Sequence, residues 1–122
     1  MIKISKLIKS FQYAGRGLRL IWQKEQNFRL QIFAGIIVLF LAFYFNINFF
    51  EFIIILFLIG IVILGELINT VIERVCDVIE PEKNSRIRDI KDMSAAMVLL
   101  IFVFASIVGF IIFLPYLFNL VE

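Results

Sequence analysis

Two acidic residues and an asparagine lie in a segment that is otherwise apolar enough to cross a membrane. They are Glu66, Asn69 and Glu73, and the residues just before them, 52–65, are all apolar or glycine. At about 100° per residue, Glu66 and Glu73 share one face of a helix, and Asp77 extends that face by a further turn. A carboxylate at membrane depth is energetically costly, so this polar stripe indicates a functional site.

The residue types around the stripe suit phosphoryl transfer from a nucleotide to a lipid. Neighbouring carboxylates bind Mg²⁺, which usually arrives with substrate phosphates. Glu25 precedes the first apolar run at a similar depth, and Lys91 and Asp92 open the last one. Lysine near the carboxylates would hold the phosphates, and the deeper Glu66 would meet a lipid hydroxyl. The sequence has no Gly-x-x-x-x-Gly-Lys loop and no protein-kinase motif, which excludes the soluble kinase folds.

The elements that must position these residues are membrane helices. The chain has 122 residues, of which 62% are hydrophobic, and its mean hydropathy is +1.01. A soluble helical bundle would need a polar face on every long helix, and the apolar run 93–121 has none. We therefore expect an all-α membrane protein with one domain, 1–122, and spans at 29–46, 50–79 with a cytoplasmic extension, and 92–115. Small residues in the last span predict close packing in a bundle.

The N-terminal segment, 2–23, has the pattern of an amphipathic helix lying in the lipid headgroup layer. Apolar residues recur at helical spacing from Ile4 to Trp22, and the opposite face carries Lys3, Lys6 and other basic residues. Such a helix is typical of membrane surfaces. The alternative is a basic face that binds anionic lipid and does nothing more.

The distribution of charge predicts the orientation. Every Lys and Arg lies before residue 30 or in 74–91. The positive-inside rule then places the N-terminus and the 74–92 loop in the cytoplasm, and the 46–51 turn and the C-terminus outside. No secretory signal peptide is evident. With no His and the single Cys76, an intrachain disulfide and a zinc site of Cys and His are excluded.

Three stretches resemble the bacterial diacylglycerol kinase and undecaprenol kinase family. They are Glu66-Leu-Ile-Asn-Thr-Val-Ile-Glu73 followed by Asp77, Lys91-Asp-Met-Ser-Ala-Ala-Met-Val-Leu99, and Phe11-Gln-Tyr-Ala-Gly-Arg-Gly-Leu18 with Glu25-Gln-Asn-Phe-Arg29. The resemblance covers nearly the whole chain. It implies a small integral-membrane kinase of the bacterial inner membrane, a homotrimer that uses Mg-ATP to phosphorylate a lipid alcohol at the cytoplasmic face.

The resemblance also implies roles for individual residues. Glu66 matches the catalytic base, and Glu25 and Glu73 match the metal ligands. Positions that match the lipid site are Arg29, Glu66 and Ala95. Positions that match the ATP site are Lys6, Tyr13, Glu25, Asn69, Glu73, Asp77, Glu82, Asn84, Lys91 and Asp92. The chain departs from many relatives at Asn84 and Gln31, where they carry His, which puts the nucleotide affinity in question.

Several alternatives remain open from the sequence. The acceptor is undecaprenol or diacylglycerol; Glu25-x-Asn27 and the ending Ile111-Ile-Phe-Leu-Pro-Tyr-Leu117 slightly favour undecaprenol. A non-enzymatic oligomer that conducts protons or cations through Glu66 and Glu73 is the alternative from another class, and only a kinase would be stabilised by Mg-ATP. Glu66 and Asn69 can also be read as an interhelical pair that specifies assembly. Three spans are too few to shield the stripe from lipid, which predicts a homo-oligomer.

Overall fold

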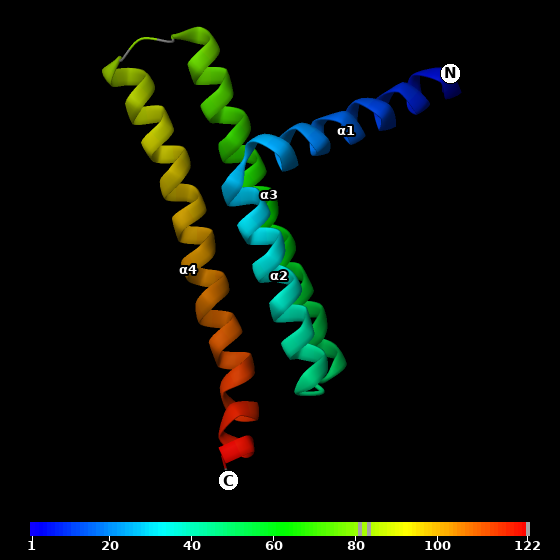
Figure 1. The fold of residues 1–122 in the computed structure, drawn as a ribbon, viewed down its shortest axis with the longest axis vertical. Coiled ribbons are helices and arrows are strands. Elements are labelled where there is room, and N and C mark those ends of the chain that lie inside the picture. Colours follow the sequence, from blue (N-terminus) through cyan, green and yellow to red (C-terminus); the bar gives the residue numbers. More distant parts are fainter. Residues whose placement is uncertain (81, 83, 122) are drawn as a thin grey trace.

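The computed structural model describes residues 1–80, 82 and 84–121, and these residues form four helices without any strand. The helices are α1 (Ile4–Lys24), α2 (Gln26–Tyr44), α3 (Phe49–Ile79) and α4 (Ser85–Val121). Helices α2, α3 and α4 are each long and apolar enough to cross a membrane. They run side by side with alternating direction, and α1 leaves the top of α2 at a steep angle (Figure 1). The predicted all-helical fold with three candidate spans is confirmed.

Helix α4 extends beyond the expected span 92–115 at both ends. It begins at Ser85, where the side chain of Asn84 accepts a hydrogen bond from the Arg86 amide at 2.8 Å and thereby caps the helix. The helix also continues past Pro115 to Val121, although the proline has no N–H to donate to the preceding turn. Pro81, Lys83 and Glu122 lie outside the described residues.

The turn between α2 and α3 is fixed by two capping motifs. Asn46 adopts a positive φ of 51°, and the amides of Asn46 and Ile47 donate to Phe43 and Ala42 at 3.2 Å each, which is a Schellman ending. Asn48 and Glu51 then form a reciprocal capping box at the start of α3. The hydroxyl of Tyr116 also donates to Glu51 and so ties α4 to this turn.

Helix α3 packs against both α2 and α4, and glycines permit the close approach. A Cβ added at Gly35 of α2 would lie 2.9 Å from Ile59, and one added at Gly65 of α3 would lie 2.8 Å from Ile101. The outward faces carry large exposed side chains such as Phe40, which is 71% exposed. An apolar surface of this kind is compatible with surrounding hydrocarbon.

Candidate active site

Glu66 lies inside the bundle rather than on its lipid-facing surface. Its side chain is only 5% exposed, and its Oε2 accepts a hydrogen bond from Nε2 of Gln31 on α2 at 3.4 Å. The other amide atom of Gln31, Oε1, is buried and has no partner among the described residues. The site therefore contains a buried carboxylate with a polar neighbour that has spare hydrogen-bonding capacity.

Asn69 and Glu73 follow Glu66 on the same face of α3. Asn69 is 7% exposed, and its Nδ2 donates to Oε1 of Glu73 one turn later at 3.3 Å. Glu25 comes from a different part of the chain, and it reaches the same helix through its contact with Arg74, the residue after Glu73.

Glu25 occupies the corner between α1 and α2. Its backbone is extended, and its carboxylate makes no capping bond to the first amides of α2 within the described chain. The carboxylate instead accepts a hydrogen bond from Nη2 of Arg74 on α3 at 3.3 Å. The link between Glu25 and Arg74 joins the corner to the helix that carries Glu73.

Arg29 closes the same corner from the α2 side. Its Nη1 donates to the carbonyl oxygens of Trp22 at 2.6 Å and Gln23 at 3.1 Å. The ring of Trp22 packs edge-on against Phe28, with centroids 6.4 Å apart. Arg29, which the resemblance places in the lipid site, thus also holds the end of α1 in position.

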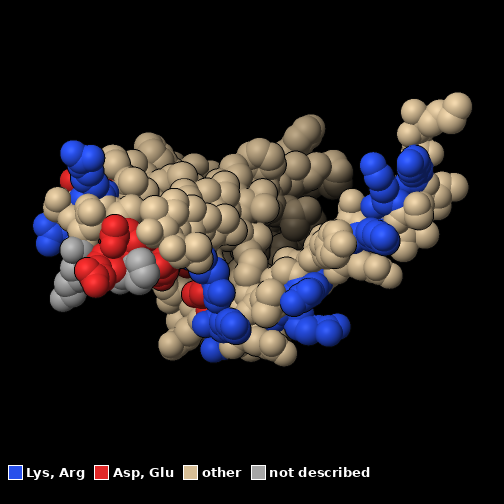
Figure 2. Space-filling model, turned by 90° about the horizontal axis from the view of Figure 1, so that it is seen from above, with Lys and Arg blue, Asp and Glu red and all other residues tan. Residues whose placement is uncertain are grey.

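A polar pocket of about 440 Å³ lies between the end of α3 and the start of α4. Lys91 and Asp77 form an ion pair at its wall. The pocket is lined by Asp77, Glu80, Glu82, Asn84, Ser85, Ile87, Arg88 and Lys91. Four of the expected nucleotide-site residues, Asp77, Glu82, Asn84 and Lys91, are thus brought together here. Figure 2 shows acidic and basic side chains gathered at this end of the molecule.

Other expected site residues lie apart from this pocket in the single chain. Helix α1, which carries Lys6 and Tyr13, packs on α2 and extends away from α3 and α4 (Figure 1). Asp92 and Ala95 are exposed and do not line the pocket.

Sequence reasoning assigned no site role to Arg74, Thr70 or Ser94, and it noted Gln31 only as a departure from relatives. Arg74 pairs with Glu25, Gln31 contacts Glu66, and the hydroxyls of Thr70 and Ser94 are buried without a partner in the described chain. The available signal was their polarity next to or within apolar runs, but the sequence alone did not show what they face.

The acidic residues fit a metal that brings some of its own ligands. Among the described residues there is no group of three or more His, Cys, Asp or Glu side chains arranged to hold a metal ion. Glu25 and Glu73 offer two carboxylates, and Glu25 contacts Arg74, the residue that follows Glu73 in α3. Mg²⁺ is commonly held by one or two carboxylates together with water and substrate phosphates. The donor set therefore fits Mg²⁺ that arrives with a nucleotide, not an all-protein cage.

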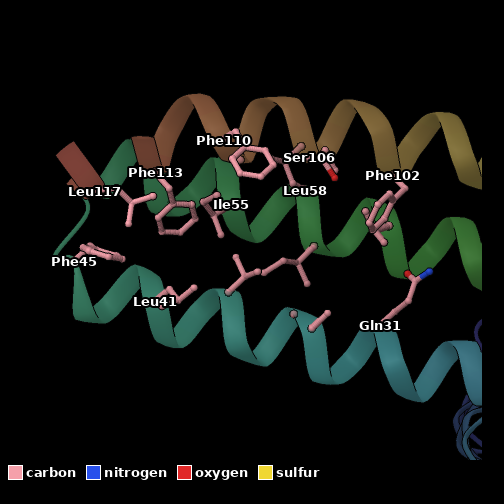
Figure 3. A pocket seen from close by; sticks show the side chains of 17 residues that line it. Gln31, Leu41, Phe45, Ile55, Leu58, Phe102, Ser106, Phe110, Phe113 and Leu117 are labelled. Atoms are coloured by element: carbon pink, nitrogen blue, oxygen red, sulfur yellow. The ribbon is translucent and has the colours of Figure 1, made fainter. Parts of the chain in front are cut away.

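An apolar cavity of about 490 Å³ extends between α2, α3 and α4. Gln31 lies at one end of it, and Phe45, Phe113 and Leu117 lie at the other (Figure 3). Since Gln31 also contacts Glu66, the cavity has its polar end beside the buried carboxylate. An amphiphile with a hydroxyl at one end of an apolar chain would match this arrangement.

Comparisons with known proteins point to the same chemistry. Residues 12–113 match the family model described as prokaryotic diacylglycerol kinase. The chain is 35% identical over 113 residues to an undecaprenol kinase of Bacillus subtilis (strain 168), covering 93% of this chain and 92% of the relative. It is 31% identical over 115 residues to a diacylglycerol kinase of Synechocystis sp., covering 93% of this chain and 66% of that relative.

Proposed function

The chain belongs to the prokaryotic diacylglycerol kinase family of multi-pass membrane proteins, which are ATP-dependent lipid kinases. We propose that it phosphorylates a membrane lipid alcohol and that Glu66 is the general base. Membership in this family assigns an enzyme rather than a conducting oligomer. The observation that best supports the role of Glu66 is its burial beside Gln31 at the polar end of the apolar cavity.

In the proposed reaction the lipid chain occupies the apolar cavity and its hydroxyl reaches Glu66. Glu66 accepts the hydroxyl proton while the lipid oxygen forms a bond to the γ-phosphorus of ATP and the bond from that phosphorus to the ADP oxygen breaks. Catalysis of this type consists mainly of positioning and electrostatic stabilisation. Mg²⁺ held by Glu25 and Glu73 would neutralise charge on the phosphates when it is bound.

We place the nucleotide in the polar pocket at the cytoplasmic end of α3 and α4. Lys91 would contact the phosphates, and Asp77, Glu82 and Asn84 would contact the rest of the nucleotide. Asn69 and Asp92 do not line this pocket, so they would contact only a part of the nucleotide that extends beyond it. The spare capacity of Asn84 supports this role, because its Oδ1 caps α4 while its amide nitrogen remains a donor. We propose that Asn84 changes the affinity for the nucleotide relative to the His that many relatives carry at this position.

We also propose that the enzyme is a homotrimer whose active sites are shared between subunits. Lys6 and Tyr13 lie on α1, which extends away from the chain's own pocket (Figure 1), so they would serve a neighbouring subunit. Partners from a second copy would also satisfy Asn69 Oδ1 and Ser94 Oγ, which are buried without a hydrogen bond among the described residues. Unsatisfied polar atoms at membrane depth favour such coverage.

The proposed orientation follows the charges. With Lys and Arg confined to the N-terminal segment and 74–91, the N-terminus and the α3–α4 turn face the cytoplasm of a bacterial inner membrane, and the C-terminus lies outside. Figure 2 looks onto this charged end. The nucleotide pocket then opens where ATP is present.

We propose undecaprenol as the acceptor, with diacylglycerol as the alternative. The relative that this chain matches over 92% of its length is named an undecaprenol kinase. The test is to assay the purified full chain in vesicles with Mg-ATP and either undecaprenol or dioleoylglycerol at equal mole fraction. A higher kcat/KM for undecaprenol is expected. A higher value for dioleoylglycerol would reverse the choice, and no transfer to either lipid would refute the kinase assignment.

A further inference from the structure

Arg74 is a cation within the acidic site to which neither the sequence motifs nor the catalytic scheme assigns a role. It follows Glu73 directly in α3, and its Nη2 lies 3.3 Å from Oε1 of Glu25. The Arg74 side chain is 48% exposed and that of Glu25 is 26% exposed. One guanidinium group therefore contacts one of the two proposed metal ligands and is the sequence neighbour of the other.

Within the described chain, the carboxylate of Glu25 contacts Arg74 and not the backbone of its own helix. Glu25 occupies the N-cap position of α2, which favours Ser, Thr, Asp or Asn rather than glutamate. Carboxylates that share a site repel one another, and Arg74 supplies a positive charge to Glu25 at 3.3 Å.

We propose that Arg74 is a placeholder for the metal ion: it holds Glu25 while the site is free of metal, and it turns to the nucleotide phosphates when Mg²⁺ takes Glu25. This inference rests on the proposed function, in which Glu25 and Glu73 bind the metal. A partly exposed ion pair contributes little to stability, so a divalent ion can displace the guanidinium. The planar guanidinium fork of arginine is suited to phosphate oxygens, which a metal-bound nucleotide would bring to this site.

The proposal predicts opposite effects on two binding reactions when Arg74 is replaced by glutamine. Without nucleotide, Mn²⁺ should bind Arg74→Gln several-fold more tightly than the wild type, because a competing cation is gone. In saturating Mg²⁺, β,γ-methylene-ATP should bind the variant about tenfold more weakly, because a charge-assisted hydrogen bond to phosphate is lost. A residue with only a structural role would not change the two affinities in opposite directions.

Both affinities are measured on the purified full chain in lipid nanodiscs, with electron paramagnetic resonance of free Mn²⁺ and calorimetry of the ATP analogue. Arg74→Lys is the conservative control. Its Mn²⁺ affinity should be near the wild-type value, and its affinity for β,γ-methylene-ATP should be only partly restored. In a Glu25→Gln background, Arg74→Gln should no longer tighten Mn²⁺ binding.

The possible results separate this proposal from the function on which it rests. If both affinities fall in Arg74→Gln, or if neither changes, the placeholder role is overturned while the kinase assignment stands. If the wild type itself fails to bind the ATP analogue, the nucleotide site is wrong and the role of Arg74 falls with it.

Discussion

Replacing Glu66 with glutamine removes one negative charge from the interface of α2 and α3 and leaves the shape of the side chain almost unchanged. Glu66 is 5% exposed, and its Oε2 accepts a hydrogen bond from Gln31 at 3.4 Å. A glutamine can preserve this contact, because its carbonyl oxygen accepts from the same amide nitrogen. We therefore expect the free energy of unfolding to change by no more than about 1 kcal/mol.

The expected effect on the reaction is much larger than the effect on folding. A neutral amide cannot take the proton from the lipid hydroxyl, and general bases contribute roughly 10²–10⁴-fold to rates. At 1.36 kcal/mol for each factor of ten, this corresponds to about 2.7–5.4 kcal/mol of activation free energy. Glu66→Gln should therefore lower kcat at least about 100-fold while the protein remains folded.

The assay measures the initial rate of lipid phosphorylation in vesicles at saturating Mg-ATP, together with thermal unfolding of each variant. Asp89→Asn is the matched control, since it removes a carboxylate from an exposed position of α4 and should leave both quantities unchanged. A Glu66→Gln enzyme that keeps more than about a tenth of the wild-type kcat would contradict the general-base role. Glu66→Ala should in addition lower stability, because the buried amide of Gln31 loses its partner.

Lys91→Met breaks the exposed ion pair with Asp77, so the free energy of unfolding should change by less than about 1 kcal/mol. The KM for ATP should rise about tenfold, because a cation that contacts phosphate is lost. An unchanged KM in steady-state kinetics would remove Lys91 from the nucleotide site. A Cβ at Gly35 would lie 2.9 Å from Cγ2 of Ile59, whereas a Cβ at Gly60 meets nothing within 4 Å. Denaturation in detergent should therefore show a loss of about 1–3 kcal/mol for Gly35→Leu and a much smaller one for Gly60→Leu. Equal losses would contradict the packing argument. Lys6 lies on α1, which extends away from the chain's own pocket (Figure 1), so co-assembling inactive Glu66→Gln with an inactive Lys6→Ala variant should restore part of the activity if a neighbouring subunit supplies Lys6. Complete absence of recovery would confine each site to one chain.

The membrane helices were predictable from the sequence because hydropathy reports directly on a single physical demand, the exclusion of charge from hydrocarbon. The early start of α4 at Ser85 was not predictable in this way, since residues 85–92 are charged and hydropathy carries no information about a helix that continues into water. Its start depends on the side chain of Asn84, which caps the helix. The helix also passes Pro115, where contacts such as that of Tyr116 with Glu51 support the last turns.

The predictable part of the site is the part carried by one helix. The spacing of Glu66, Asn69 and Glu73 fixes their common face, because helical periodicity relates residues of the same helix. Contacts between helices depend on how each helix is rotated about its axis and how far it is shifted along it. Here the close packing of Gly35 against Ile59 and of Gly65 against Ile101 fixes both quantities. For this reason the partners Gln31 and Arg74 were not found from the sequence.

The unpaired polar atoms of the single chain connect its packing to its proposed assembly. Asn69 Oδ1, Thr70 Oγ1, Ser94 Oγ and Gln31 Oε1 are buried and have no hydrogen-bond partner among the described residues. Buried polar atoms without partners are costly, and more so where water is excluded. A chain selected only for the stability of the isolated bundle would replace these side chains with apolar ones, since removing an unpaired polar atom is close to neutral or stabilising. Gln31 and Asn69 contact Glu66 and Glu73, and the unpaired atoms are therefore best accounted for by groups that arrive later, a lipid hydroxyl, a nucleotide or a neighbouring subunit.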